Sequence, residues 1–197
     1  EIANVCGADG VRYLAEASAK TPLTVKIMFP SCVPATPYEN SGAVLDSGEI
    51  AAHIGDKGVW GLGEYMNYPG VVNAAEEDVK KLCVARRKGC AVDGHAPELS
   101  GKELNAYLCG GIKTDHECMG EKEIEEKIAR GMYVHIREGS ATRNAAANAK
   151  VSCNSKNFFI AAAPPFMIQE TQEECKERKG KKDGARPKAM PRPMGIL

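Results

Sequence analysis

Two of the chain's four histidines lie in similar settings within the stretch DGHAPELSGKELNAYLCGGIKTDHEC, residues 93–118. His95 follows Asp-Gly, His116 follows Thr-Asp, and each comes directly after a short apolar run. Upstream, Glu64 ends the run GVWGLGE in the same way. Divalent first-row metals readily bind imidazole and carboxylate groups, and a bound metal lowers the pKa of its water towards ~7. Together the three residues predict a metal site that supplies hydroxide for hydrolysis.

Each of these residues also has an ordinary structural explanation. A lone histidine at a strand end is more often hydrogen-bonded than metal-bound, and Glu64 by itself is equally suited to a helix cap or an ion pair. The occurrence of all three favours metal. His53, in GEIAAHIGDKG, is expected on a helix surface, and His135, in YVHIR, on a strand. The eight cysteines are scattered without a Cys-x-x-Cys pair, so packing is their expected role.

The elements that would position these residues alternate between apolar runs and helical patterns, which is typical of βα units on a parallel sheet. The apolar runs predict strands at 23–29, 58–66, 89–95, 111–116 and 131–138. Between them, Ser100 and Glu103 have the spacing of a helix-capping box, and Gly131 is expected to end a helix. Because neighbouring strands lie ~4.8 Å apart, residues at their carboxyl ends can meet around one ion.

Polar residues at the strand ends favour a (β/α)8 TIM barrel over a doubly wound sheet. A doubly wound nucleotide-binding sheet is expected to carry G-x-G-x-x-G after its first strand, and GLGEYM is a different motif. We therefore predict an α/β fold in which residues 1–150 form a partial (β/α)8 barrel covering roughly strands 2 to 7. Residues 151–197 lose the periodic apolar pattern and are expected to form a divergent, disordered tail.

The composition indicates which classes of partner and which cellular compartment to expect. The 197 residues are 43% hydrophobic, and the 26 basic and 26 acidic residues cancel, so charge gives no reason to expect nucleic acid or a membrane surface as partner. The run FFIAAAPPFMI is broken by two prolines and is shorter than the ~20 residues of a membrane span. Scattered cysteines fit reduced thiols in the cytoplasm. Because the chain starts at Glu1 rather than Met, we expect an internal fragment.

Five blocks of the sequence resemble the adenine deaminases of bacteria and archaea, metal-dependent members of the amidohydrolase superfamily. Between Glu1 and about Asn144, these blocks read EIANVCGADGVRYLAEAS, FPSCVPATPYENSGAVL, GVWGLGEYMNYPGVVN, VDGHAPELSGKELNAYLCGGIKTDHEC and GMYVHIREGSATRN. The resemblance implies a (β/α)8 barrel with a binuclear centre of manganese or iron, or of zinc, in which Glu64 bridges and His95 and His116 are ligands. It also implies Glu64 and His116 as catalytic residues and adenine as the small-molecule substrate.

The sequence departs from this family at two functional positions. The His-x-His pair of the first strand would lie upstream of Glu1, and no Thr-Asp-Asp-like block supplies the eighth-strand acid/base Asp, for which Asp183 is no substitute. The resemblance leads us to expect hydrolytic deamination of adenine to hypoxanthine and ammonia in purine salvage, with Arg137 and Glu138 reaching the base. Another amidohydrolase acting on a ring amide or amidine, or a catalytically inactive remnant, stays open, as does a homo-oligomer.

Overall fold

The computed structural model describes residues 2–137, 145, 158–161 and 167–168. The helices are α1 (Ile2–Ser18), α2 (Ser47–His53), α3 (Tyr68–Val72), α4 (Glu76–Arg87), α5 (Gly101–Cys109) and α6 (Glu121–Ala129). The strands are β1 (Ile27–Pro30), β2 (Val59–Tyr65), β3 (Ala91–Gly94), β4 (Thr114–Asp115), β5 (Tyr133–Arg137), β6 (Phe158–Ala161) and β7 (Met167–Ile168). Each of the predicted apolar runs overlaps one of the strands β1 to β5, and helices separate these strands.

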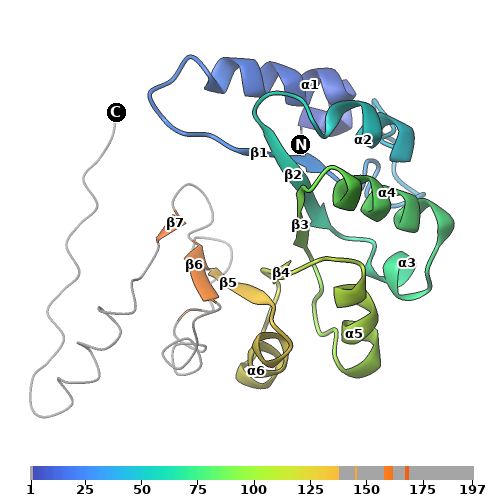
Figure 1. The fold of residues 1–197 in the computed structure, drawn as a ribbon, viewed down its shortest axis with the longest axis vertical. Coiled ribbons are helices and arrows are strands. Elements are labelled where there is room, and N and C mark those ends of the chain that lie inside the picture. Colours follow the sequence, from blue (N-terminus) through green and yellow to red (C-terminus); the bar gives the residue numbers. More distant parts are fainter. Residues whose placement is uncertain (1, 138–144, 146–157, 162–166, 169–197) are drawn as a thin grey trace, which may run out of the picture.

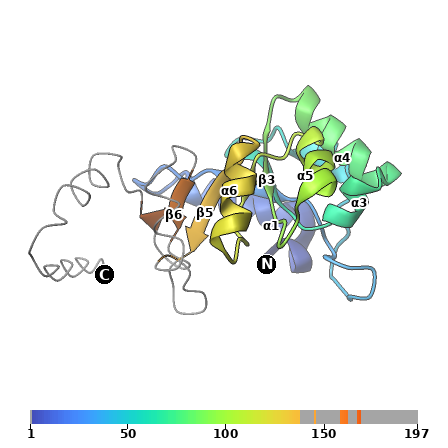
Figure 2. The ribbon, with the colours of Figure 1, turned by 90° about the horizontal axis from the view of Figure 1, so that it is seen from below.

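The strands form two hydrogen-bonded groups, in the orders β1-β2-β3 and β4-β5-β6-β7. Pairing is parallel from β1 to β3 and from β4 to β6. Figures 1 and 2 show α4, α5 and α6 following one another along one side of the strands. The expected α/β class with parallel strands is therefore confirmed.

The strands β6 and β7 differ from the expected pattern. They pair antiparallel, whereas a (β/α)8 barrel is built from parallel strands. Both fall in the segment 151–197, which was expected to form a divergent, disordered tail. The remainder of the predicted tail lies outside the described residues.

The strands β3 and β4 belong to different hydrogen-bonded groups although they lie next to each other, and we call this junction the β3–β4 seam. Side-chain bonds cross it. Thr114 Oγ1 accepts a 2.9 Å hydrogen bond from Gly94 N and donates one to Asp93 Oδ1. The approach is close, because a Cβ atom on Gly94 would lie 2.1 Å from the carbonyl oxygen of Thr114. Glycine at position 94 thus allows the two strands to meet.

The helix ends near the site show one correct and one incorrect prediction. Gly131, with a φ of 88°, closely follows α6, as expected for a glycine that ends a helix. The capping box predicted at Ser100 is wrong, because Ser100 occupies the cap position of α5 without a side-chain cap bond. Gly101 N instead donates a 2.8 Å hydrogen bond to Glu126 Oε1. The start of α5 is therefore held by α6 rather than by its own cap.

Among the residues that the structure describes, two hydrophobic clusters pack the helices against the strands. The larger contains, among others, Phe29, Ile50, Leu62, Leu82 and Leu104. The buried members of the smaller are Cys118, Ile124, Val134 and Ile136. Full burial of an aliphatic or aromatic side chain contributes about 1.5–3 kcal/mol, so each cluster stabilises its own part of the chain. The larger serves mainly β1 to β3 and the smaller β5 with α6.

The described cysteines are reduced thiols that form no disulfide with one another. Cys6, Cys83 and Cys109 are exposed, whereas Cys118 is buried. Burial raises the pKa of the Cys118 thiol, which therefore stays protonated and donates a 3.0 Å hydrogen bond to Asp115 Oδ2. In the part of the chain that the structure describes, no helix combines the length and the apolar character needed to cross a bilayer.

Candidate metal centre

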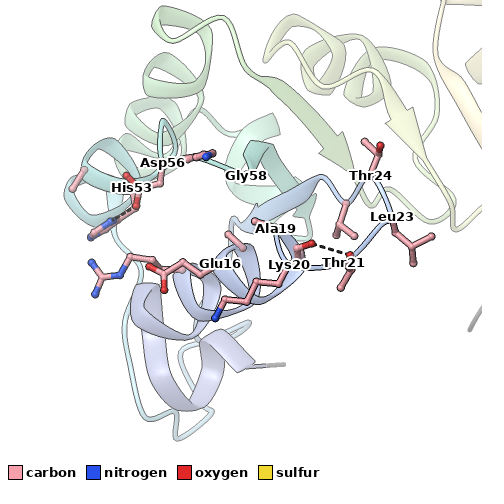
Figure 3. Close-up of a pocket in the computed structure, with 15 residues that line it drawn as sticks. Glu16, Ala19, Lys20, Thr21, Leu23, Thr24, His53, Asp56 and Gly58 are labelled. Carbon is pink, nitrogen blue, oxygen red and sulfur yellow. Dashed lines mark hydrogen bonds and ion pairs between the residues drawn. The ribbon is translucent and has the colours of Figure 1, made fainter.

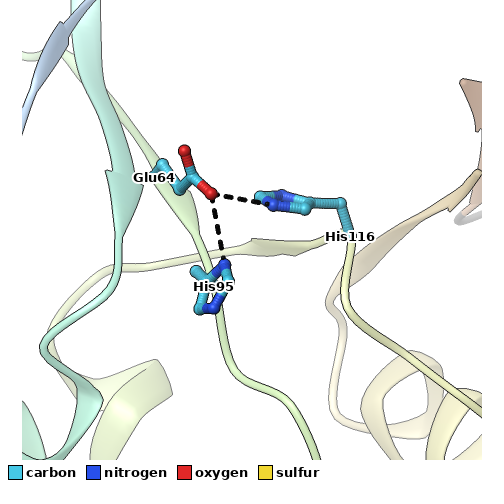
Figure 4. A group of neighbouring side chains, drawn as sticks. All are labelled: Glu64, His95 and His116. Atoms are coloured by element: carbon cyan, nitrogen blue, oxygen red, sulfur yellow. Dashed lines mark hydrogen bonds and ion pairs between the residues drawn. The ribbon is translucent and has the colours of Figure 1, made fainter. Parts of the chain in front are cut away.

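Glu64, His95 and His116 come from the carboxyl ends of three neighbouring strands and face one another (Figure 4). Glu64 Oε1 lies 3.2 Å from His116 Nε2 and 3.3 Å from His95 Nδ1. One ligand atom from each residue lies within 4.8 Å of the other two, and the two imidazole centroids are 5.3 Å apart. The structure thus brings together all three residues that the sequence pattern selected.

An irregularity of β2 directs Glu64 towards the histidines. The register between β2 and β3 shifts between Leu62 and Tyr65, and Glu64 has a φ of 44°. A bulge of this kind bends the strand and redirects a side chain. Ser31 Oγ donates a 2.9 Å hydrogen bond to the Glu64 carbonyl oxygen and so holds the bulge from β1.

The buried hydroxyl of Tyr107 joins the strand ends that carry Glu64 and His95. It accepts a 2.9 Å hydrogen bond from His95 N and donates a 2.9 Å hydrogen bond to the carbonyl oxygen of Tyr65. Burial raises the pKa of Tyr107, so the hydroxyl keeps its proton and can serve as donor and acceptor at once. Helix α5 therefore fixes the spacing of two candidate ligands without touching a metal.

Asp115 holds the residue after His95 from the other side of the β3–β4 seam. Its Oδ1 accepts a 2.9 Å hydrogen bond from Ala96 N, and its Oδ2 accepts a 2.7 Å hydrogen bond from Lys127 Nζ. Lys127 Nζ also donates to the Ala96 carbonyl oxygen at 2.5 Å. Both side chains of this ion pair are fully buried. The segments that carry His95 and His116 are thus locked together by a charged pair shielded from water.

A second group of metal-binding residue types, Asp115, Cys118 and Glu123, gathers beside this pair. Lys127 Nζ already lies 2.7 Å from Asp115 Oδ2 and 2.6 Å from Glu123 Oε1. A cationic side chain therefore occupies the position that a metal would need, and we assign this group a structural role.

The charges of the candidate metal centre are coupled. The contacts with His116 and His95 hold the pKa of Glu64 far below its usual range, against the opposing effect of partial burial. Burial by itself lowers the pKa of His116, but the hydrogen bond to Glu64 and the charge of Asp93 raise it overall. Glu64 is consequently an anion at neutral pH, which is the form in which a carboxylate binds a metal.

The donor set fits a divalent metal. His95 Nδ1 is buried and has no hydrogen-bond partner among the described residues, although it lies 3.3 Å from Glu64 Oε1. A buried polar atom without a partner is costly, and a metal ion would satisfy it. Two imidazole nitrogens and a carboxylate oxygen suit first-row divalent ions. Glu64, His95 and His116 would hold such an ion.

The other residues singled out from the sequence lie in varied places. Arg137 ends β5, and its guanidinium donates a 2.7 Å hydrogen bond to Glu117 Oε2. Glu138 lies outside the described residues. His53 ends α2 and pairs with neighbouring carboxylates, in agreement with its expected helix position. His135 is on β5 as expected, and burial lowers its pKa.

Sequence reasoning missed several residues around the site, among them Glu117, Tyr107 and Lys127. Glu117 adjoins His116, and its Oε1 lies 3.5 Å from His116 Nε2. Tyr107 and Lys127 are on helices, where an aromatic residue ordinarily indicates packing and a lysine indicates solvent exposure. The only available signal was the position of Glu117 next to a candidate ligand.

A cavity of about 860 Å³ lies between α1, the loop that follows it and the end of α2 (Figure 3). The residues that line it include Glu16, Lys20, Thr24, His53 and Gly58. Gly58 directly precedes β2, whereas Glu64 lies near the carboxyl end of the same strand. The cavity therefore adjoins the opposite end of the strands and is separate from the candidate metal centre.

Comparison with known proteins places the chain in a family. Residues 1–180 match the amidohydrolase family. Adenine deaminase 2 of Desulfotalea psychrophila is 53% identical over 144 residues, which are 73% of this chain and 25% of the relative. The adenine deaminase of Clostridium acetobutylicum is 54% identical over 144 residues, 73% of this chain and 25% of the relative.

The adenine deaminase of Dehalococcoides mccartyi is 49% identical over 175 residues, which are 89% of this chain and 28% of the relative. The chain thus spans about a quarter of the length of these curated relatives. The family match itself extends over nearly the whole chain and includes the strand ends that carry Glu64, His95 and His116. On this basis the chain belongs to the amidohydrolase family.

Proposed function

We propose that the longer protein to which this chain contributes deaminates adenine hydrolytically, yielding hypoxanthine and ammonia. The observation that carries the proposal is the convergence of Glu64, His95 and His116 at neighbouring strand ends. The reaction is suggested by adenine deaminases that are 49–54% identical to the matched part of this chain. Because the chain spans about a quarter of those relatives, the activity is assigned to the longer protein. In this proposal β1 to β5 are consecutive strands of its (β/α)8 barrel.

Glu64, His95 and His116 would hold divalent metal in a binuclear centre of manganese or iron, with zinc as the alternative. When bound, the metal supplies hydroxide at neutral pH by lowering the pKa of a water. Glu64 contributes a carboxylate that its contacts with His116 and His95 keep free of a proton. In the overall reaction a C6–O bond forms, the C6–N bond breaks, and the amine gains a proton before it leaves. Glu64 and His116 are the residues that we assign to catalysis.

The end of β5 is the proposed contact with the purine. Arg137 lies there, next to Glu138 in the sequence, and its side chain is 22% exposed. Its ion pair places the guanidinium beside Glu117, whose other carboxylate oxygen lies 3.5 Å from His116 Nε2. The purine contact, the cytoplasmic location and self-association stay predictions.

The proposal is tested on the longer protein by the release of ammonia from adenine in the presence of manganese. The H95A, H116A and E64Q variants are each expected to lower kcat/KM by at least about 100-fold, because each removes a donor from the metal that generates the nucleophile. H53A is the matched control, since His53 lies at the end of α2, and it should keep the wild-type rate. Wild-type turnover by H95A or H116A would contradict the proposal.

Substrate choice is tested with the same protein. Adenine should be deaminated faster than cytosine or adenosine, and a chelator should stop the reaction. Equal rates on adenosine, or activity that a chelator does not affect, would point to a different amidohydrolase reaction.

A further inference from the structure

Glu117 presents a second carboxylate to the two histidines. Its Oε1 lies 3.5 Å from His116 Nε2 and 3.8 Å from His95 Nδ1. Donor atoms bound at ~2.1 Å to one metal ion lie ~3.0–3.4 Å apart. The corresponding distances from Glu64 Oε1 are 3.2 Å and 3.3 Å. A small movement of the Glu117 side chain therefore brings it to ligand spacing.

Arg137 engages the other oxygen of this carboxylate. Its Nη2 donates a 2.7 Å hydrogen bond to Glu117 Oε2. The two side chains are only 22% and 19% exposed, so the bond is partly shielded from water. Charge-assisted bonds of this kind are short and about twice as strong as neutral ones. With Oε2 held by Arg137, Oε1 of Glu117 is left facing the histidines.

We propose that Glu117 is a further carboxylate donor of the metal centre and that Arg137 is the residue that positions it. The inference rests on the metal centre of the proposed function and adds to its donor set a carboxylate two residues after β4, which Arg137 holds from the end of β5. Two carboxylates, from Glu64 and Glu117, balance the charge of a divalent ion. The guanidinium of Arg137 offsets the repulsion between these carboxylates before the ion binds.

The test measures metal binding by the longer protein rather than adenine turnover. Mn²⁺ titration gives the dissociation constant of each variant, and the absorption spectrum of bound Co²⁺ reports its donor set. E117Q is expected to weaken Mn²⁺ binding about 10- to 100-fold and to change the Co²⁺ spectrum. E125Q is the matched control, because Glu125 is an exposed glutamate of α6, and it should change neither quantity.

The role of Arg137 is tested by combining variants. R137Q is expected to weaken Mn²⁺ binding and to alter the Co²⁺ spectrum, and R137K should recover most of both. Because Arg137 acts through Glu117, R137Q should cost no further affinity when E117Q is already present. An equal loss from R137Q in both backgrounds would overturn the positioning role.

The outcomes separate this inference from the proposed function. Wild-type affinity and an unchanged Co²⁺ spectrum in E117Q, with E64Q impaired, would overturn the inference alone. If the wild-type longer protein itself bound no metal, the metal centre and the role of Glu117 would both be overturned. If circular dichroism shows that E117Q is unfolded, E117D decides instead: a changed Co²⁺ spectrum supports the inference and an unchanged one overturns it.

Discussion

Glu64 contributes to the site from a backbone conformation that most residues avoid. Its φ of 44° lies in the left-handed region, which costs a non-glycine residue roughly 1–3 kcal/mol. Two hydroxyl groups hold the chain there, from Ser31 to the Glu64 carbonyl oxygen and from Tyr107 to that of Tyr65. The placement of a candidate ligand thus depends on side chains that stay away from the metal.

Replacing Tyr107 with Phe tests this dependence. Y107F leaves the His95 amide and the Tyr65 carbonyl without their partner, and one unsatisfied buried group costs about 1–3 kcal/mol. The free energy of unfolding, measured with urea, should fall by at least the cost of one such group, and Mn²⁺ binding should weaken with it.

Y38F is the control for this variant, because Tyr38 is 94% exposed. It should change the free energy of unfolding by less than about 0.5 kcal/mol. Equal midpoints of urea unfolding for Y107F and Y38F would show that the hydroxyl of Tyr107 does not stabilise the fold.

At the level of elements, helix α6 supports the β3–β4 seam. Lys127 reaches from α6 to Asp115 on β4 and to the carbonyl oxygen of Ala96 after β3. Glu123, one turn earlier on α6, accepts a 2.8 Å hydrogen bond from Glu98 N. The helix therefore replaces, through charged side chains, part of the backbone pairing that β3 and β4 do not share.

Removing the Lys127 charge should weaken the whole seam. K127M leaves the buried Asp115 without its counter-charge, and breaking one partner of a buried ion pair costs about 3–5 kcal/mol. Thermal unfolding should show a correspondingly large drop in stability. K122M, at an exposed position of the same helix, should be nearly neutral. In the double variant K127M/D115N the loss should be smaller, and an undiminished loss would contradict the ion-pair explanation.

The sequence predicted those features that follow from periodicity. Apolar runs located β1 to β5, and the rule that parallel strands share one carboxyl edge brought Glu64 and His116 together. The sequence did not predict the structural role of Lys127. A lysine in a charged helix ordinarily faces solvent, and only the fold shows that this one is buried. The bulge at Glu64 was equally hidden, since it depends on the register between β2 and β3.

For the whole molecule, the family match and the sequence pattern differ on the residue at which the amidohydrolase domain ends. The amidohydrolase match continues to residue 180, whereas the loss of apolar pattern suggested a boundary at residue 150. The relatives are about four times longer than the matched part, so most of their residues have no counterpart in these 197. From the resemblance we expect further ligands and the acid/base Asp in those parts.

The 197-residue chain by itself should therefore show no measurable deamination of adenine. Loss of an acid/base group alone lowers a rate ~10²- to 10⁴-fold, and an incomplete donor set adds to the loss. Joining the chain in frame to the flanking segments of a relative should restore the release of ammonia. Robust metal-dependent turnover by the 197 residues alone would refute this assignment.

The β3–β4 seam also divides the candidate ligands. Glu64 lies on β2 and His95 directly follows β3, both in the group β1-β2-β3, whereas His116 directly follows β4 of the other group. An ion shared by all three would brace the two groups against each other, so that metal binding and folding become thermodynamically linked. A ligand that binds only the folded state at 100 times its Kd stabilises it by about 2.7 kcal/mol. Calorimetry should show a Tm that rises with added Mn²⁺, and H116A should lose this rise. A Tm that does not change with added Mn²⁺ would mean that the two groups of strands are held together without the metal.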